Sequence, residues 1–380
     1  MIKTSSPSSI LEFGSTHIRL GVYDKYILNQ SLFYEEKINY EKNENLEEDH
    51  PIDNLIRRAE KDVSQHLNEI ILMMDSPSIY SLDFSIQKNY DKKIISNIDL
   101  DHIINECENI IKINNREKEI IHILKTEVNF DGKTIDNLEN ISQEASKVTI
   151  ELKFILISKK IYDFFKTMLL KKHISLKNVF CTSYIKSLGL INKIGISGYS
   201  SFIDIGLNKS SLTIFKDDKL LYLSNTHVAG DHITKDIAKV LKIDYRKAES
   251  QKLKFSENNE LKKDVKESNL LKKIINSRLE EIIELLFLNC PLVQNKTFDS
   301  NLKLFFIGNG SRALNENLLS FGNEFNFIAD MSIINEEMKD GCNSALKYIA
   351  NHEKTQTLKP TISIENKGFF EKLFEYFARN

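Results

Sequence analysis

Residues 201–224 read SFIDIGLNKSSLTIFKDDKLLYLS, with apolar strands on both sides of a short turn that begins at Gly206. Apolar side chains alternate along the two strands, which predicts a β-hairpin. Residues 10–24, ILEFGSTHIRLGVYD, have the same form around a Gly-Ser-Thr turn. Both hairpins lead into mixed helix and strand patterns, so the pair indicates an internal duplication in an α/β chain.

The segments between the hairpins alternate between helix and strand patterns. Apolar residues at helical spacing predict a helix over residues 54–67, and the apolar run at 70–74 predicts a buried strand. Residues 78–158 differ in character and follow the order β-α-β-β, after which helix and strand patterns like those of the opening region return. We interpret this middle segment as an insertion.

The chain beyond the second hairpin is mostly helical and charged from residue 231 to residue 288. A buried strand and a glycine turn return near Leu302, and the last regular helix is predicted at 343–350. Residues 352–367 are polar, contain a proline and lack periodicity, which is typical of a tether.

Composition narrows the class of protein. The 380 residues include 52 Lys and Arg against 54 Asp and Glu, a net charge of −2, so no basic field points to a nucleic-acid partner. The start of the sequence lacks the apolar core of a signal peptide, and the longest apolar stretch, residues 282–293, is too short to span a bilayer. The four cysteines lack zinc-ligand spacing, and we expect reduced cytosolic thiols at Cys107, Cys181, Cys290 and Cys342.

The most specific family signal lies at residues 228–255, VAGDHITKDIAKVLKIDYRKAESQKLKF. It resembles the Gly-Gly-Asp-His-Ile-Thr-x-Asp-Ile-Ala and Ala-Glu-x-x-Lys segments of FtsA, a bacterial division protein of the actin-like ATPase superfamily. Residues 122–138 resemble part of the subdomain, called 1C, that FtsA inserts, and the helix around Arg278 resembles the Pro-Arg-x-x-Glu helix of its subdomain 2B. The resemblance implies an α/β, actin-like (ribonuclease H-like) duplicated fold with an inserted FtsA-type 1C subdomain and a C-terminal amphipathic helix.

The resemblance also implies a division of the chain into the subdomains of FtsA. Each half of the duplication contributes one core subdomain and one variable one. The expected segments are subdomain 1A at 1–69 and 154–198, inserted subdomain 1C at 70–153, subdomain 2A at 199–232 and 301–351, subdomain 2B at 233–300, a flexible linker at 352–367 and an amphipathic membrane-targeting helix at 368–380.

The two hairpin turns are the predicted phosphate site. Glycine in such a turn lets backbone amides approach phosphate oxygens, and the matched pair of turns at Gly14 and Gly206 favours this interpretation over that of an ordinary turn. The resemblance implies ATP with Mg²⁺, held by the acidic residues before the turns, Glu12 and Asp204. Glu12 stands where the family has Asp and extends the carboxylate by about 1.5 Å. We therefore expect an ATP-binding protein with weak or absent ATPase activity, and assign no catalytic residue.

The second turn departs from the Asp-Ile-Gly-Gly-Gly-Thr pattern of FtsA, because Leu207 and Asn208 replace two glycines. Asn tolerates left-handed backbone, and the next residue, Lys209, offers a point charge to a phosphate. The alternative is a hairpin that kept its shape and lost its ligand.

Two further segments complete the predicted nucleotide site. Residues 306–311, FIGNGS, resemble the adenosine motif of the family. Glu249 and Lys252 share a face of a predicted helix, and the resemblance implies contact with ribose and adenine, the alternative being a solvated ion pair. The predicted nucleotide-contacting residues are Glu12, Gly14, Ser15, Thr16, Asp204, Gly206, Asn208, Lys209, Gly230, Glu249, Lys252, Gly308, Asn309 and Gly310.

The C-terminal segment carries an apolar stripe at helical spacing. Burial of each such side chain is worth about 1.5–3 kcal/mol, enough for reversible attachment to a membrane. Docking on the protein's own core is the alternative. Nearby basic residues suit anionic lipids. The stripe comprises Phe369, Phe370, Leu373, Phe374 and Phe377.

The resemblance implies a division adaptor that tethers FtsZ polymers to the cytoplasmic face of the bacterial inner membrane at the septum. The C-terminal peptide of FtsZ would dock on subdomain 2B, with Arg278 as a contact. Head-to-tail self-association into filaments and contacts with other division proteins are also implied. The alternatives are an actin-fold ATPase or phosphotransferase, and a pilus-type actin-like scaffold that binds the cytoplasmic tail of a membrane protein.

Overall fold

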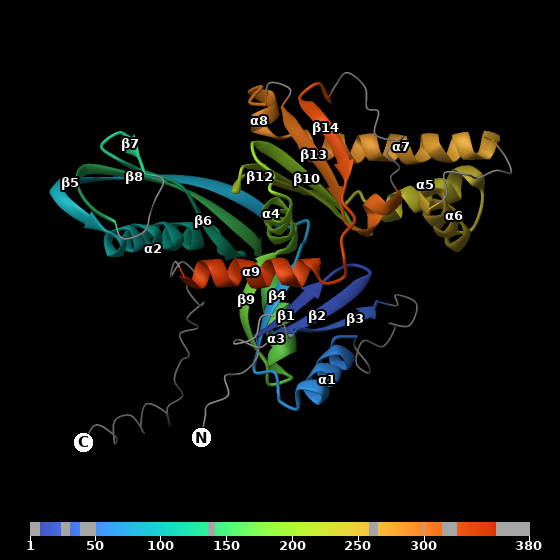
Figure 1. Ribbon diagram of the computed structural model, residues 1–380, viewed down its shortest axis with the longest axis horizontal. Helices are drawn as coiled ribbons and strands as arrows, with labels where there is room; N and C mark the ends of the chain where they lie inside the picture. Colours follow the sequence, from blue (N-terminus) through green and yellow to red (C-terminus); the bar gives the residue numbers. More distant parts are fainter. Residues whose placement is uncertain are drawn as a thin grey trace.

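Two five-stranded sheets form the centres of two lobes in the computed structural model of the chain (Figure 1). The structure describes residues 8–23, 31–38, 51–135, 141–257, 265–298, 301–313 and 325–354. A third sheet forms an arm that extends to one side, and three helices of the second lobe extend to the other.

The first sheet has the strand order β3-β2-β1-β4-β9. The first three strands are antiparallel neighbours, and β4 and β9 continue the sheet in parallel with β1. Helices α1 (Pro51–Val63) and α3 (Lys159–Leu170) pack on this lobe. The strands are β1 (Ser8–Phe13), β2 (His17–Tyr23), β3 (Ser31–Lys37), β4 (Glu69–Met74) and β9 (Ser175–Cys181).

The second sheet repeats the pattern in the order β12-β11-β10-β13-β14. Again three strands are antiparallel and two more follow in parallel. The repeated order confirms the duplication predicted from the hairpins. The strands are β10 (Tyr199–Ile205), β11 (Ser210–Lys216), β12 (Lys219–Thr226), β13 (Leu302–Ile307) and β14 (Ile328–Ile333).

The second lobe also carries the charged helical region predicted between its strands. Its helices cover the sheet with apolar faces that share one core with β10 and β13. The elements are α5 (Gly230–Leu241), α6 (Tyr245–Glu257), α7 (Val265–Phe287), α8 (Pro291–Gln294) and a short 3₁₀ helix, η1 (Asn309–Ala313).

The arm follows the predicted β-α-β-β order with one additional two-residue strand, β7, and forms a sheet in the order β5-β8-β6-β7, packed against α2. It is fastened to the first lobe where the imidazole Nε2 of His122 accepts a hydrogen bond from the amide of Cys181 at 3.0 Å. Its elements are β5 (Tyr80–Ser96), α2 (Asn97–Asn114), β6 (Lys118–Phe130), β7 (Lys133–Thr134) and β8 (Ser142–Ser158).

The sheet pairing moves both expected limits of the insertion. We expected the inserted subdomain to begin at residue 70, but β4 belongs to the first sheet because it pairs with β1 and β9. The arm begins with β5 at Tyr80, and its last strand continues to Ser158 instead of ending at residue 153.

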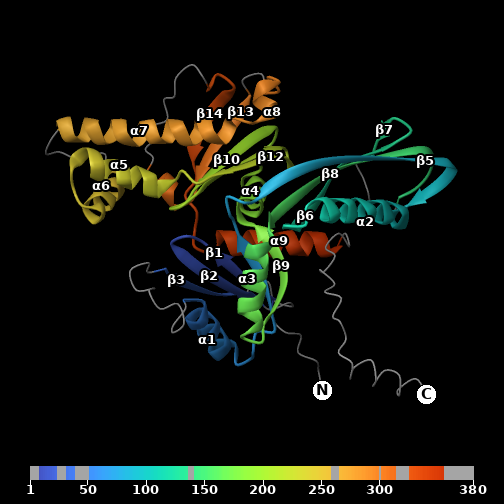
Figure 2. The same ribbon diagram turned by 180° about the vertical axis from the view of Figure 1, so that it is seen from behind.

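Two helices cross between the lobes. Helix α4 (Thr182–Ile194) connects β9 to β10, and α9 (Asp340–Lys354) follows β14 and packs on α4 and on the first sheet. Figure 1 has α9 in front of the first sheet, whereas Figure 2 has α3 in front, so these helices cover opposite faces. The sequence predicted a helix at 343–350 within α9 but missed α4.

The expected linker begins inside α9, which continues to Lys354. The rest of the linker and the predicted amphipathic helix at 368–380 lie outside the described residues. Within the described ranges, no helix combines the length and the apolar character needed to cross a membrane.

The contact between α4 and α9 gives a first prediction. A Cβ on Gly189 of α4 would lie 2.0 Å from Ser344 Oγ and 3.3 Å from Ser344 Cα of α9, so the helices must separate to admit it. Alanine favours a helix by about 1 kcal/mol over glycine, but overpacking costs about 1–3 kcal/mol. We expect Gly189→Ala to lower the free energy of unfolding in urea by about 1–2 kcal/mol.

Asn192→Ala is the matched control on the same helix, because Asn192 is exposed. It should change stability by less than about 0.5 kcal/mol. A Gly189→Ala protein more stable than the wild type would show that α4 and α9 do not approach this closely.

Candidate nucleotide-binding cleft

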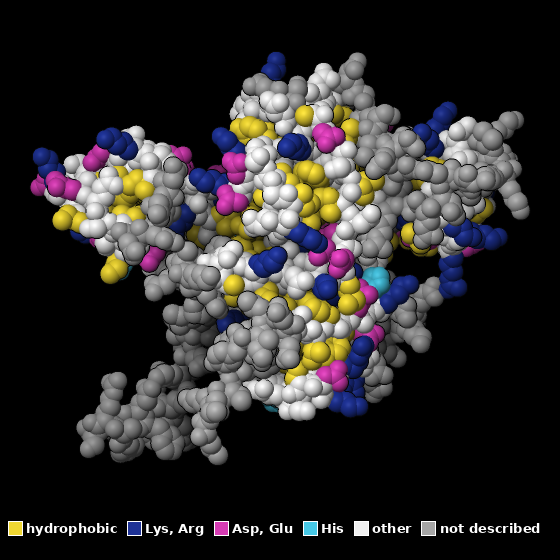
Figure 3. Space-filling model, viewed as in Figure 1, with side chains coloured by type: hydrophobic (Ala, Val, Ile, Leu, Met, Phe, Trp, Pro, Cys, Tyr) yellow, Lys and Arg dark blue, Asp and Glu magenta, His cyan; other side chains and the backbone are white. Residues whose placement is uncertain are grey.

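A cavity of about 600 Å³ lies between the lobes, where the two hairpin turns face each other. All the predicted nucleotide-contacting residues line it except Asn208. Charged side chains of both signs gather along the boundary between the lobes on the face shown in Figure 3. The structure therefore brings together residues that are as much as 298 positions apart, from Glu12 to Gly310.

The two predicted phosphate turns close in the same way. The amide of Gly14 donates to the carbonyl of His17 at 3.0 Å, and the amide of Gly206 donates to the carbonyl of Lys209 at 2.9 Å. A Cβ on Gly206 would lie 3.6 Å from the hydroxyl of Ser15 in the other turn. The second hairpin thus keeps its shape although two glycines of the family pattern are absent, and the two turns lie close together.

The third turn requires glycine at Gly308. Its φ of +85° lies in the left-handed region, and a Cβ there would lie 2.1 Å from Asp204 Oδ1. Its amide donates to Glu336 Oε2 at 2.9 Å. This turn is consequently packed directly against the carboxylates at the base of the cleft.

Those carboxylates are joined by a lysine that the sequence analysis missed. Lys186 of α4 places Nζ 2.9 Å from Asp204 Oδ2 and 2.9 Å from Glu336 Oε2, with a side chain only 9% exposed. Burial alone would lower the pKa of Lys186, but Asp204, Glu336 and Glu12 together raise it above its usual range. The group therefore remains an ammonium ion. Its only signal in the sequence is a lysine within the apolar segment YIKSLGLI.

The other predicted metal ligand, Glu12, also faces a cation of the protein. Arg19 of the neighbouring strand places Nη1 3.4 Å from Glu12 Oε1 and donates from Nε to Glu35 Oε1 at 2.7 Å. Glu12 Oε2 is buried and accepts no hydrogen bond from any described residue. It points toward Gly341 at the start of α9, where a Cβ would lie 2.5 Å away.

Lys209, which the sequence predicted as a phosphate contact, pairs with a carboxylate of the protein in this structure. Its ammonium lies 2.9 Å from Asp75 Oδ2 at the end of β4, so the ion pair crosses from the second lobe to the first. The Asp75 carboxylate is only 2% exposed and accepts hydrogen bonds from the Ser183 amide at 3.1 and 3.2 Å. Burial would raise the pKa of Asp75, but Lys209 and the amide hold it below its usual range.

The predicted pair on α6 is not a solvated ion pair. Lys252 is 4% exposed and donates to the Gly230 carbonyl at 3.1 Å and to Thr234 Oγ1 at 2.7 Å, while its Nζ lies 2.7 Å from Glu249. These contacts of Lys252 hold α6 against the first turns of α5. Tyr245 and Leu253 line the same wall of the cavity, and the sequence analysis had missed both.

The carboxylates do not fit Mg²⁺ in this arrangement. A magnesium ion needs carboxylate oxygens that face it at short distance in octahedral geometry. Here Lys186 occupies the space between Asp204 and Glu336, and Arg19 lies beside Glu12. Across the described part of the chain, no three His, Cys, Asp or Glu side chains form a group that could hold a metal ion.

Arg278, the predicted contact for FtsZ, lies on α7 and outside the cleft. Its Nε and Nη2 both lie 2.6 Å from Asp236 Oδ2 of α5, and Nη1 pairs with Glu281. The guanidinium therefore joins α5 to α7. A partner's carboxylate could bind it only by exchange with one of these two residues.

Comparisons with known proteins agree with this fold. Residues 201–322 match the family model of the cell division protein FtsA. The solved structure of the PilM–PilN type IV pilus biogenesis complex is similar to this chain with a TM-score of 0.56 and 12% identity, over 93% of this chain and 99% of that chain.

Within residues 201–322 the chain is similar to the FtsA family, and over most of its length it has the fold of the PilM–PilN structure. MreB5 of Spiroplasma citri bound to ADP is a further similar structure, with a TM-score of 0.47 and 12% identity over 93% of this chain and 98% of that one. No curated protein matches the sequence. At identities this low, the solved structures show the fold alone.

The Lys209–Asp75 pair gives a prediction for acid stability. Because the folded-state pKa of Asp75 is depressed, its carboxylate contributes stability that is present above about pH 4 and is lost as the pH falls further. We expect Asp75→Asn to lower the free energy of unfolding by about 3–5 kcal/mol at pH 7. The difference from the wild type should shrink below about pH 4.

Urea unfolding between pH 7 and pH 3 measures this difference. Asp101→Asn is the control, because Asp101 is half-exposed and lies 3.9 Å from Lys125. An Asp75→Asn difference that stays constant down to pH 3 would mean that the ion pair is not its source.

Proposed function

We propose that this chain is a division adaptor of the FtsA type, which binds FtsZ polymers and holds them at the cytoplasmic face of the inner membrane at the septum. The observation that carries the proposal is the match of residues 201–322 to the FtsA family model. That region contains the second phosphate turn, helices α5 to α7 and the glycine turn after β13. It thus includes both the segment proposed to bind FtsZ and half of the cleft.

The FtsZ C-terminal peptide would dock on the helices that correspond to subdomain 2B. Arg278 supports this assignment as an exchangeable cation, since its present partners Asp236 and Glu281 are partly exposed carboxylates. Helix α7 also exposes Leu270 and Leu285. An acidic peptide with apolar residues would match this combination of a cation and exposed leucines.

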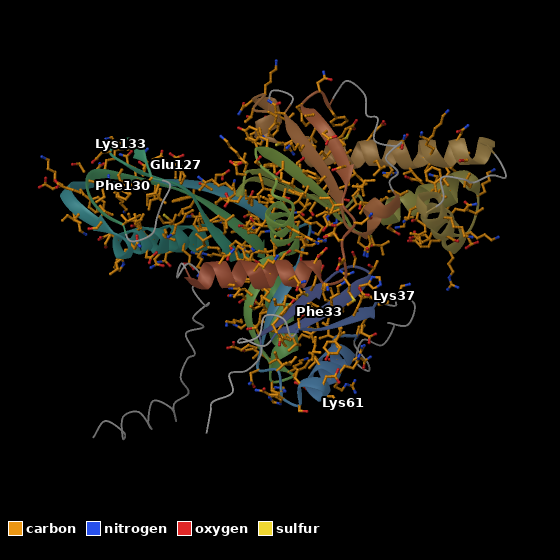
Figure 4. The ribbon with its side chains drawn as sticks, viewed as in Figure 1. Phe33, Lys37, Lys61, Glu127, Phe130 and Lys133 are labelled. Atoms are coloured by element: carbon orange, nitrogen blue, oxygen red, sulfur yellow. The ribbon has the colours of Figure 1, made fainter. Side chains whose placement is uncertain are left out.

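The cleft would bind a nucleotide without hydrolysing it. The turns at Gly14 and Gly206 supply backbone amides for phosphates, and Tyr245 with Leu253 supplies an apolar wall for a base. Lys37, exposed at the end of β3, also lines the cavity and adds a positive charge near its rim (Figure 4). Hydrolysis is disfavoured because Lys186 holds Asp204, the carboxylate that would otherwise assist a metal or a water.

Attachment to the membrane would come from the apolar stripe at residues 369–377 binding anionic lipids. Head-to-tail filaments would add many such weak helices into one firm attachment, and other division proteins would join the same assembly. The pilus-type scaffold is the second candidate, because PilM–PilN has the same overall fold. It would bind a membrane protein's tail and leave FtsZ in solution.

Co-sedimentation with liposomes of anionic lipid tests the proposal. We expect the full chain to carry FtsZ into the pellet, and a chain that ends at Asn366 to leave it in the supernatant, because the shorter chain lacks the apolar stripe. FtsZ without its C-terminal peptide should stay in the supernatant with either chain.

Phe370→Ser/Phe374→Ser should abolish sedimentation, whereas the control Glu371→Ser/Glu375→Ser on the same segment should retain it. If the full chain sediments with the liposomes while FtsZ stays in the supernatant, the result would favour the scaffold. A full chain that stays soluble with every lipid would contradict the adaptor function.

A further inference from the structure

Three acidic side chains from separate parts of the fold converge at the base of the cleft. Glu12 is the second-last residue of β1, Asp204 is the second-last residue of the corresponding strand β10, and Glu336 precedes α9. Asp204 and Glu336 each lie 2.9 Å from the ammonium of Lys186, and the charge of Glu12 also acts on that ammonium. Buried carboxylates this close repel one another unless a cation lies between them.

The geometry of the cluster is fixed by the backbone around it. Glu336 Oε2 accepts a second hydrogen bond from the Gly308 amide, and Asp204 Oδ1 lies where a Cβ on Gly308 would be. Lys186 is held by α4, the helix that connects the lobes. Because this ammonium is part of a side chain of the protein, it stays between the two carboxylates whether or not a ligand is bound.

The chemistry of an ammonium ion matches this position. Lysine has three N–H donors, of which two are used by Asp204 and Glu336. The third remains for an anion in the cavity that Lys186 lines. A divalent cation would have to displace Lys186 from two charged partners, which would leave its ammonium nearly buried and without them.

We propose that the ammonium group of Lys186 takes the place of a divalent cation in this cleft, so that neither the folded lobes nor an anion bound between them requires Mg²⁺. The part of the inference that concerns a bound nucleotide rests on the proposed function. The part that concerns the protein alone does not, and the two are measured separately.

Thermal unfolding of the full chain tests the protein alone. In wild type, 5–10 mM Mg²⁺ in place of EDTA should shift the melting temperature by less than about 1 °C, since the carboxylates are already occupied. Lys186→Met removes the cation between Asp204 and Glu336, so its melting temperature should fall by about 5 °C or more and rise again by several degrees in Mg²⁺. Lys193→Met, two turns further along α4, should show neither effect.

Two results would overturn the inference: a rise of several degrees in the wild type with Mg²⁺, or a Lys186→Met protein that responds to Mg²⁺ no more than Lys193→Met does. If Lys186→Met does not fold, Lys186→Met/Glu336→Gln removes one of the repelling charges and takes its place in the same titration. The wild-type measurement is decisive in either case.

Binding of a fluorescent ATP analogue tests the bound anion. The dissociation constant should agree within about twofold between excess EDTA and Mg²⁺, whereas binding that is tenfold or more tighter with Mg²⁺ would overturn the inference. Absence of binding in both buffers would overturn the proposed nucleotide site. The effect of Mg²⁺ on the melting temperatures would then still test whether Lys186 takes the place of a divalent cation.

Discussion

The arrangement of the two lobes depends on the ammonium of Lys186, buried between Asp204 and Glu336. One contact joins α4 to the end of β10, and the other joins α4 to the segment that leads into α9, so both crossings between the lobes meet at a single charge. A buried ion pair stabilises a fold only where good geometry offsets the loss of water. Such a pair tolerates little displacement, which sets the position of the crossing helices more sharply than apolar packing alone.

Lys209 and Asp75 form a second ion pair of a lysine with a buried carboxylate, and this pair also joins the two lobes. The sequence led us to expect that Lys209 offers its charge to a phosphate, but in the structure that charge is bound by a carboxylate of the opposite lobe. The cleft thus contains cations and carboxylates that largely neutralise each other within the protein. Lobes positioned by the chain itself are compatible with the proposed adaptor function, whereas a hydrolytic cycle would require them to move.

Local patterns were sufficient to predict the hairpins, the order of the arm and the charged helices, because alternation and helical periodicity are properties of neighbouring residues. They failed for α4, which buries Lys186 and Ser187 together with its apolar residues and so has no polar face. The subdomain bounds implied by the resemblance placed residues 70–74 in the arm, whereas the local pattern, which put the insertion at 78–158, agrees with the sheet pairing. The glycine turns of the site were predicted, but the partners of Lys186 and Lys209 were not, since each pair joins residues distant in sequence.

The family match covers residues 201–322, and two charged side chains of the cleft within it, together with one backbone amide, are bound to residues outside it. Asp204 is held by Lys186, Lys209 by Asp75, and the amide of Gly308 by Glu336. The same Asp-Ile-Gly sequence before a turn would present a carboxylate to a metal in one chain and to a lysine in another. The chemistry of the matched segment is therefore determined by what the unmatched part of the chain places against it, which is why a local resemblance predicts the fold of this cleft better than its ligand.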